Sequence, residues 1–240
     1  MNEILLILSL PLIYGTVLAA YKRFGKVGLY AWTVFATITA NLEVLLLVDA
    51  FGIEQTLGNV LFGSTFLVTD ILSEKYGKED AQTAVDLGVV TSIAFIVLSR
   101  LWLMYTPSVN DWAMPSFQTI FTNTPRVMLA SVLVFAVVQR FDVWLYHKWW
   151  EFSTKRFGDG KRFLWLRNNG STMLSQLLNT ILYTFGAFGG LYELPTLISI
   201  CISSYAVFFI TSLADTPFVY WARAMKTKNP CKRSEPVPQR

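Results

Sequence analysis

The chain has 240 residues, of which 53% are hydrophobic, 15% are aromatic and only 15% are charged. Its mean hydropathy of +0.45 places it outside the class of soluble globular proteins. The net charge of +4 is modest, and the basic residues form no groove-sized patch, so we expect no nucleic-acid partner. Composition therefore predicts an all-α integral membrane protein whose main partner is the lipid bilayer.

Seven stretches are long and apolar enough to be interpreted as membrane-spanning helices. They cover residues 4–21, 28–50, 56–73, 83–105, 126–147, 168–190 and 195–222. The connections between them are short except near 106–125 and 148–167, so little chain is left for a soluble domain. We expect a seven-helix bundle forming a single transmembrane helical domain over residues 1–225. A cytoplasmic tail would follow over residues 226–240, and its last five residues, 236–240, are expected to be disordered because they are short, polar and broken by proline.

The distribution of Lys and Arg predicts how the bundle crosses the membrane. These residues fall in alternate connections and in the tail, whereas the connections 51–55, 106–125 and 191–194 contain none. Basic connections are cytoplasmic, so we expect a multi-pass protein of the cytoplasmic (inner) membrane with its amino terminus outside and its carboxyl terminus inside. The first span resembles a secretory signal, but it begins with Glu3 in place of a basic residue, which favours a retained helix.

A regular row of polar residues marks the sixth span. Asn168, Thr172, Gln176, Asn179 and Tyr183 follow one another at steps of four, four, three and four, which places them on one helical face. The stretch from 169 to 190 contains no ionised residue. Polar groups inside a membrane need partners. The row therefore either joins this helix to its neighbours or lines a pocket for a small, polar, planar molecule.

Further polar residues lie deep in other spans. Asp70 and Glu74 stand one turn apart near the inner end of the third span. We expect Glu74 to be a solvated helix end, and Asp70, which lies deeper, to bind a ligand or a packed polar partner. Gln139 and Asp142 share one face of the fifth span, and Asn41 lies near the middle of the second. These residues are candidates for a binding site.

Catalytic and metal-binding patterns are missing from the sequence. His147 is the only histidine, and the Cys and acidic residues show no ligand spacing, so we expect neither a metal nor a cofactor. Asp215 precedes Thr-Pro, and we expect it only to shape its own helix. An intramembrane enzyme acting through Asp70 and Asp142 is a less favoured alternative, because the deeper polar groups are neutral amides. The chain is not expected to be an enzyme.

Three motifs resemble one family. They are TDILSEKYG around Asp70, QRFDVWLYHKW with Gln139 and Asp142, and LRNNGSTMLSQLLNT followed by FGAFGG. In this order they are similar to the queuosine precursor transporter family, also described as a vitamin uptake transporter group. The resemblance extends from about Ala40 to the end of the last span.

The resemblance implies a fold and an activity. The fold would contain six family helices over about 28–222, similar to the substrate-binding subunits of energy-coupling-factor transporters, plus one extra N-terminal helix over about 4–21. The activity would be import of a 7-deazaguanine base, the cyano or the aminomethyl form, by a secondary transporter that works without an ATPase module. The alternative is a substrate-binding subunit that needs ATPase partners.

The resemblance also implies which residues hold the substrate. Matched by position, with Tyr183 added as a stacking ring, the substrate-binding set is Asn41, Asp70, Gln139, Asp142, Thr172, Gln176, Asn179 and Tyr183. A guanine-like edge presents an N–H beside an NH₂, which a carboxylate accepts as a fork, and a C=O that amides satisfy. Asn179 departs from the family pattern, which has Asp there, and an amide cannot titrate.

Overall fold

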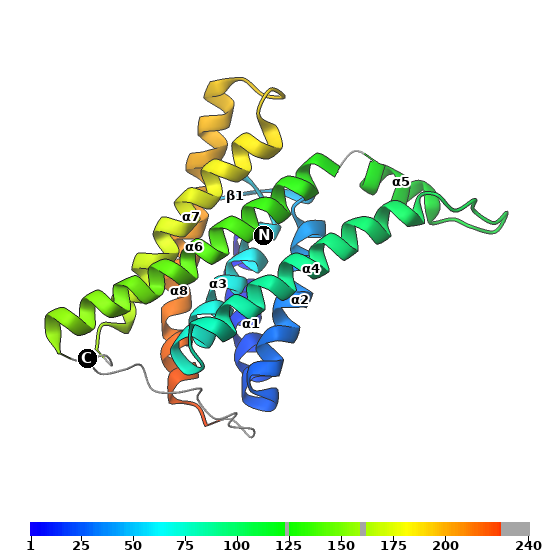
Figure 1. Cartoon of the computed structure of the whole chain (residues 1–240). Coiled ribbons are helices and arrows are strands. Elements are labelled where there is room, and N and C mark those ends of the chain that lie inside the picture. Colours follow the sequence, from blue (N-terminus) through cyan, green and yellow to red (C-terminus); the bar gives the residue numbers. More distant parts are fainter. Residues whose placement is uncertain (123–124, 159–161, 227–240) are drawn as a thin grey trace.

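The computed structural model describes residues 1–122, 125–158 and 162–226, which form eight helices and one two-stranded hairpin (Figure 1). The elements are α1 (Asn2–Phe24), α2 (Lys26–Glu43), β1 (Leu47–Ala50), β2 (Ile53–Thr56), α3 (Gly58–Lys75), α4 (Lys78–Trp102), α5 (Met114–Thr122), α6 (Pro125–Phe157), α7 (Leu164–Phe188) and α8 (Leu194–Ala224). The predicted all-α membrane class is confirmed. The tail expected over 226–240 lies outside the described residues from 227 onward.

The second span differs from its prediction, because α2 ends at Glu43 and not near residue 50. The chain between α2 and α3 forms an antiparallel hairpin in which Leu47 pairs with Thr56 and Ala50 with Ile53. Its two turn residues, Phe51 and Gly52, have φ angles of 54° and 74°, the left-handed conformation that a two-residue hairpin turn requires. Periodicity did not predict the hairpin, because its apolar residues continue the hydrophobic run of α2.

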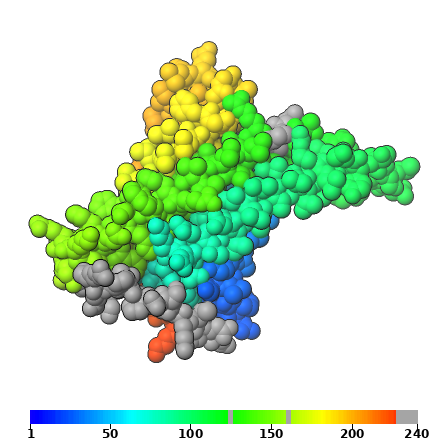
Figure 2. Space-filling model, in the orientation of Figure 1, coloured from blue at the N-terminus to red at the C-terminus, as the bar shows by residue number. Residues whose placement is uncertain are grey.

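Two connections contain more helix than the sequence predicted. α6 runs for 33 residues, about 50 Å at 1.5 Å per residue, and so includes the first half of the segment expected to link the fifth and sixth spans. No Gly or Pro interrupts it before Gly158, which has a φ of 69°. At the other end, the connection near 106–125 contains α5. Figure 1 and Figure 2 show α4 and α5 projecting from the rest of the bundle as an arm.

Helix α3 lies at the centre of the bundle. It packs against α1, α2, α4, α6 and α8. Its apolar side chains Leu67, Val68, Ile71 and Leu72 are fully buried in the main hydrophobic core, together with residues of α1, α2, α4, α6, α7 and α8. A helix enclosed in this way can carry polar side chains without exposing them to lipid, and α3 buries Ser64, Thr65, Thr69 and Asp70.

Within the described residues, four helices are long and apolar enough to cross a membrane, and they are α1, α4, α6 from Arg126, and α8. Their outward faces expose aliphatic side chains such as Leu5, Leu8, Val90, Val97, Leu133 and Ile202. Exposed apolar surface of this extent suits a lipid solvent. α2, α3 and α7 run beside these four but contain more polar residues, which face the interior. The chain is therefore a multi-pass membrane protein.

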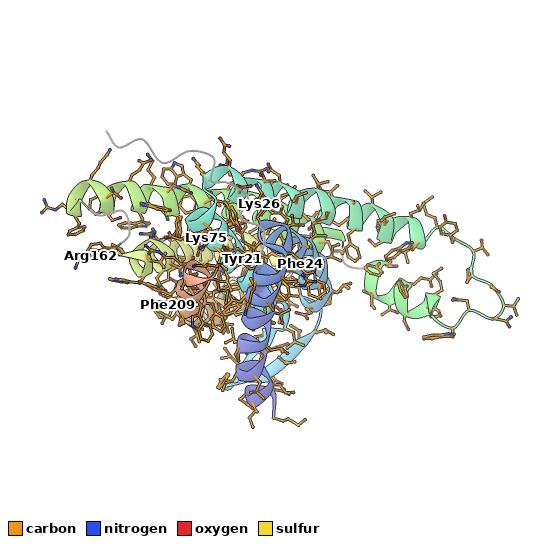
Figure 3. The ribbon with its side chains drawn as sticks, turned by 90° about the horizontal axis from the view of Figure 1, so that it is seen from below. Tyr21, Phe24, Lys26, Lys75, Arg162 and Phe209 are labelled. Atoms are coloured by element: carbon orange, nitrogen blue, oxygen red, sulfur yellow. The ribbon has the colours of Figure 1, made fainter. Side chains whose placement is uncertain are left out.

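The two ends of the bundle differ in charge. One end, which we call the basic end, contains the α1–α2 corner, the ends of α3 and α8, and the starts of α4 and α7. Lys26 binds Asp80 there, and Lys75 donates to the carbonyl oxygens of Arg223 and Met225. Figure 3 views the bundle from below, with Lys26, Lys75 and Arg162 labelled. The opposite end carries the hairpin, and we call it the hairpin end.

Substituting Gly28 by alanine is expected to destabilise the corner between α1 and α2. A Cβ at Gly28 would overlap the carbonyl oxygen of Ala20 and lie 2.7 Å from its carbonyl carbon. Because backbone atoms cannot rotate away, we expect a loss of about 1–3 kcal/mol. Gly15→Ala is the matched control, since nothing lies within 4 Å of a Cβ at that helical position. It should be neutral or stabilising in a thermal unfolding measurement in detergent, and equal effects of the two changes would contradict the prediction.

Candidate functional site

The polar row predicted from the sequence lies on α7 and faces the interior. Asn168, Thr172, Gln176 and Asn179 are buried, and Tyr183 is half-buried. α7 packs between α6 and α8, so the face with the polar row points toward the protein while Leu174, Ile181 and Phe185 point outward. The predicted helical face is confirmed. Its role as a binding surface depends on what the polar groups contact.

A pocket opens at the hairpin end of the bundle. Its volume is about 630 Å³ including the part open to the surroundings, and α2, β2, α3, α6, α7 and α8 contribute to its walls. Its lining residues are Ala40, Val44, Thr56, Gly58, Asn59, Phe62, Ser131, Asn179, Thr180, Tyr183, Thr184, Phe188, Ile200, Ser204 and Phe208. Aromatic rings with a few polar groups are typical of a site for a planar ligand. Of the predicted site residues, Asn179 and Tyr183 line it.

Two predicted amides lie next to this pocket. Gln176 is one helical turn from the lining residues Asn179 and Thr180, and Asn41 follows the lining residue Ala40. The Asn41 side chain donates from Nδ2 to the carbonyl oxygen of Thr37 at 2.7 Å. In the described part of the chain, Oδ1 of Asn41 and Oε1 of Gln176 are buried without a hydrogen-bond partner. Such acceptors carry a desolvation cost that a ligand donor would remove.

The predicted carboxylates lie deeper than the pocket. Asp70 accepts a hydrogen bond from the Thr172 hydroxyl at 3.2 Å through Oδ2. Asp142 faces Ser171 and Ser175 of α7. Among the described residues, Oδ1 of Asp70 and both oxygens of Asp142 have no hydrogen-bond partner, although both side chains are at most 1% exposed. The structure thus brings Asp70, Asp142 and Thr172 together beside α7.

Gln139 is engaged within the protein. Its Nε2 donates to the Thr65 hydroxyl at 2.6 Å, and its Oε1 accepts from the Thr69 hydroxyl at 3.3 Å. The side chain is fully buried and joins α6 to α3. In this conformation both ends of its amide are occupied, so a substrate would have to replace one of these contacts.

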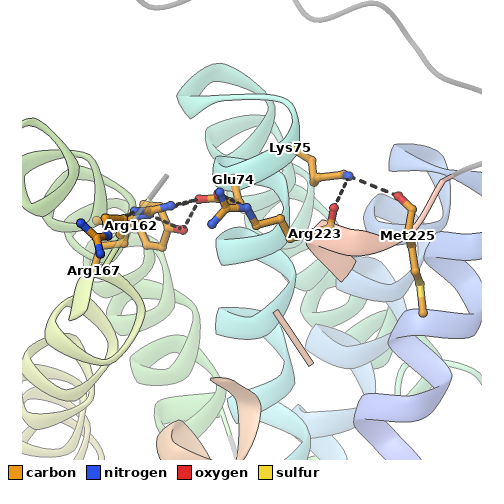
Figure 4. Close-up of polar contacts among 7 residues, drawn as sticks. Glu74, Lys75, Arg162, Arg167, Arg223 and Met225 are labelled. Carbon is orange, nitrogen blue, oxygen red and sulfur yellow. Dashed lines mark hydrogen bonds and ion pairs between the residues drawn. The ribbon is translucent and has the colours of Figure 1, made fainter. Parts of the chain in front are cut away.

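A charged cluster closes the basic end of the bundle (Figure 4). Arg167 of α7 donates to Oε2 of Glu74 from Nη2 at 2.7 Å and from Nε at 3.2 Å. The Tyr146 hydroxyl donates to the same oxygen at 3.0 Å. Arg223 of α8 lies 3.4 Å from Oε1 of Glu74, and the Arg167 guanidinium lies 4.4 Å from the ring centre of Trp150. One glutamate therefore joins α3, α6, α7 and α8, and we call these residues the Glu74 cluster.

This cluster corrects one expectation. Glu74 was expected to be a solvated helix end, but it is 8% exposed. Arg167, the last residue of the connection expected over 148–167, is fully buried. The prediction was wrong because it considered each residue within its own helix, where neither has a partner. The positions of the two residues in the sequence could have indicated that they are buried. Glu74 lies one turn after Asp70, and Arg167 immediately precedes the polar row.

Asp215 is a second residue whose contacts sequence reasoning missed. It was expected to shape only its own helix, but its Oδ1 accepts from Nδ2 of Asn168 on α7 at 2.7 Å. Asn169 adds a hydrogen bond to Thr216 at 2.7 Å. These contacts join α7 to α8 and use the first member of the polar row as a structural link.

The bundle has apolar outer faces, a buried polar column and a pocket between its helices. These features are those expected of a multi-pass membrane transporter. The family described as "Putative vitamin uptake transporter" matches residues 56–222. A protein of Bacillus subtilis (strain 168) named "Probable queuosine precursor transporter" is 42% identical over 209 residues, which are 87% of this chain and 89% of the relative. No solved structure matches. The chain belongs to this vitamin uptake transporter family, so the predicted membership is confirmed and the protein is a transporter, not an enzyme.

Proposed function

We propose that the protein is a secondary transporter that imports a 7-deazaguanine queuosine precursor, in the cyano or the aminomethyl form, across the cytoplasmic membrane. The name of the Bacillus subtilis relative supports the substrate class. The observation that carries the proposal is the row of buried acceptors on and beside α7, which begins at the aromatic pocket. These acceptors match the donor groups of a purine-like base.

The base would enter the pocket and stack on its rings. Phe62, Tyr183 and Phe208 supply aromatic surface, and Phe62 and Phe208 have their ring centres 6.1 Å apart. Asn179 and Gln176 would bind the polar edge of the ring, and Asp70 or Asp142 would accept from its N–H and NH₂ groups. The substrate-binding set therefore remains the one expected from sequence, with Gln139 available after it leaves Thr65 or Thr69.

The seven-helix count and the orientation complete the proposal. α1, α2, α3, α4, α6, α7 and α8 would each cross the membrane, with α1 as an addition to six helices arranged like an energy-coupling-factor binding subunit. The basic end would face the cytoplasm, because Lys and Arg are retained there. The amino terminus and the pocket would then face outside, and the carboxyl terminus would lie inside.

Transport would follow the polar face of α7. The pocket residue Asn179 and the Glu74 cluster residue Arg167 are 12 positions apart, about 18 Å along the helix at 1.5 Å per residue. The carboxylates lie between them. In this conformation the pocket is open at the hairpin end and the Glu74 cluster joins four helices at the basic end, which supports an outward-facing state of an alternating-access cycle. Release into the cytoplasm would require the cluster to separate.

The test is uptake of a labelled deazaguanine base by liposomes that contain only the purified protein. Accumulation of the base, without ATP or any partner, would support a secondary transporter. Binding without uptake would favour the alternative, a subunit of an energy-coupling-factor importer that needs ATPase partners. Absence of both binding and uptake would contradict the proposal.

Substituting Gln176 by leucine should weaken binding of the base by about 5- to 150-fold, which corresponds to about 1–3 kcal/mol for a lost buried partner. Calorimetric titration of the detergent-solubilised protein measures the change. Gln118→Leu is the matched control, because this amide is exposed on the peripheral helix α5. Equal affinity of wild type and Gln176→Leu would remove this amide from the site.

A further inference from the structure

The buried polar groups below the pocket are unbalanced toward hydrogen-bond acceptors. Within the described residues, the side-chain atoms there without a partner include Oδ1 of Asn41, Oδ1 of Asp70, both oxygens of Asp142 and Oε1 of Gln176. All four side chains are at most 4% exposed, so water contributes little. These five oxygens only accept, and they outnumber the hydroxyls of Ser175 and Tyr183, the buried groups beside them that can donate. A ligand that satisfied them would have to be rich in N–H groups.

The same region is also unbalanced in charge. The charged groups that act on Asp70 are all carboxylates, namely Asp142, Asp215 and Glu74. Glu74 is compensated by Arg167 and Arg223, but no ion pair in the described part of the chain includes Asp70, Asp142 or Asp215. Asp215 receives a neutral hydrogen bond from Asn168. Burying carboxylates without a counter-charge is costly, so a bound ligand that brings a positive charge would be favoured over a neutral one.

Ser175 fixes the position of Asp142 relative to the pocket. This serine is fully buried, and its hydroxyl faces Asp142, to which it can donate one hydrogen bond. It is adjacent to Gln176 and four residues from the pocket residue Asn179, about 6 Å along α7. Asp142 is thus at the depth that a base held by Asn179 and Gln176 would reach with its innermost substituent.

We infer that the site selects a base that carries a protonated amine over the same ring with a neutral substituent. Asp142 would receive the ammonium group, and the nearby Asp70 would add negative charge while its Oδ1 accepts from the ring edge. This inference rests on the proposed function, because it assumes a base in the pocket. An ammonium group supplies three N–H donors and one positive charge to a region that lacks both. Such charge-assisted hydrogen bonds are stronger than neutral ones.

The test compares two deazaguanines with the same ring, one with an aminomethyl and one with a cyano substituent, by calorimetric titration at pH 7. Wild type should bind the aminomethyl base at least about ten times more tightly than the cyano base, because a buried charge pair contributes at least this much to affinity. Asp142→Asn should reduce the ratio of the two affinities to within about threefold. It should weaken binding of the aminomethyl base only, because the introduced amide has no charge. Asp70→Asn should reduce it in the same direction.

Asp86→Asn is the matched control, because Asp86 is an exposed carboxylate on α4 that pairs with Arg140 outside the site. It should leave the ratio unchanged, and thermal unfolding of each variant verifies its folding. If wild type binds the cyano base as tightly as the aminomethyl base, or more tightly, the inference is overturned and the proposed function stands. This holds whether or not protons are taken up from the buffer. A ratio unaffected by both Asp142→Asn and Asp70→Asn also overturns it. Binding of neither base removes the proposed function itself.

Discussion

Replacing Arg167 by methionine is expected to lower the stability of the detergent-solubilised protein by about 3–5 kcal/mol, the cost of leaving a buried charge without its partner. Arg167 is fully buried and Glu74 is 8% exposed, so water cannot replace the lost guanidinium. Methionine retains much of the volume of the side chain. Glu74 would keep only Arg223 at 3.4 Å and the Tyr146 hydroxyl at 3.0 Å, so the loss should be dominated by the negative charge that Arg167 no longer balances. Thermal and denaturant unfolding measure it.

A double variant separates this charge effect from a loss of packing. Glu74→Gln combined with Arg167→Met removes both charges and should recover a large part of the lost stability, because replacing a whole buried pair costs much less than breaking it. Arg140→Met is the matched control, since Arg140 pairs with Asp86 at the surface, where ion pairs contribute about 0–1 kcal/mol. If the double variant were as unstable as Arg167→Met, packing and not charge would explain the result.

The features that the sequence predicted depend on local geometry. The polar row of α7 follows from a period of 3.6 residues, which fixes which side chains share a face whatever the helix packs against. The gathering of most Lys and Arg residues at the basic end likewise needs only the alternation of spans and connections, although Arg126 lies at the other end, beside Gly189. The central position of α3 does not follow from its composition, because its polar residues are tolerated only where other helices enclose it.

The features that the sequence did not predict depend on pairs of distant residues. Glu74 and Arg167 are 93 positions apart, and each alone resembles a boundary charge. Asn168 and Asp215 are 47 apart, and their contact gives Asp215 a role between helices. Gln139 was predicted to hold substrate, and in this conformation its amide binds Thr65 and Thr69, contacts between α6 and α3 that the sequence did not predict. The residue types indicated that these side chains would be buried or at a boundary, but they did not identify the partner.

Asp142 and Glu74 should respond to the same chemical change with opposite effects on stability. Both are buried carboxylates, but Glu74 has the charged partners Arg167 and Arg223, whereas Asp142 faces only the neutral hydroxyls of Ser171 and Ser175 among the described residues. Asp142→Asn is expected to stabilise the protein by about 1–3 kcal/mol, because it replaces one desolvated acceptor oxygen by an N–H₂ group that can donate to the Ser171 or Ser175 hydroxyl. Glu74→Gln should destabilise it.

Asp142→Asn should reduce transport although it stabilises the protein. Under the proposed function, Asp142→Asn is expected to lose most uptake of the amine-bearing base in liposomes while its unfolding temperature rises. Residues that bind a substrate often lower the stability of the protein without it, because their partners are absent until the substrate arrives. A variant that is both less stable and inactive would show that Asp142 supports the fold. In that case the carboxylate would have to be assigned to helix packing, and the substrate would have to be held by the amides of α7.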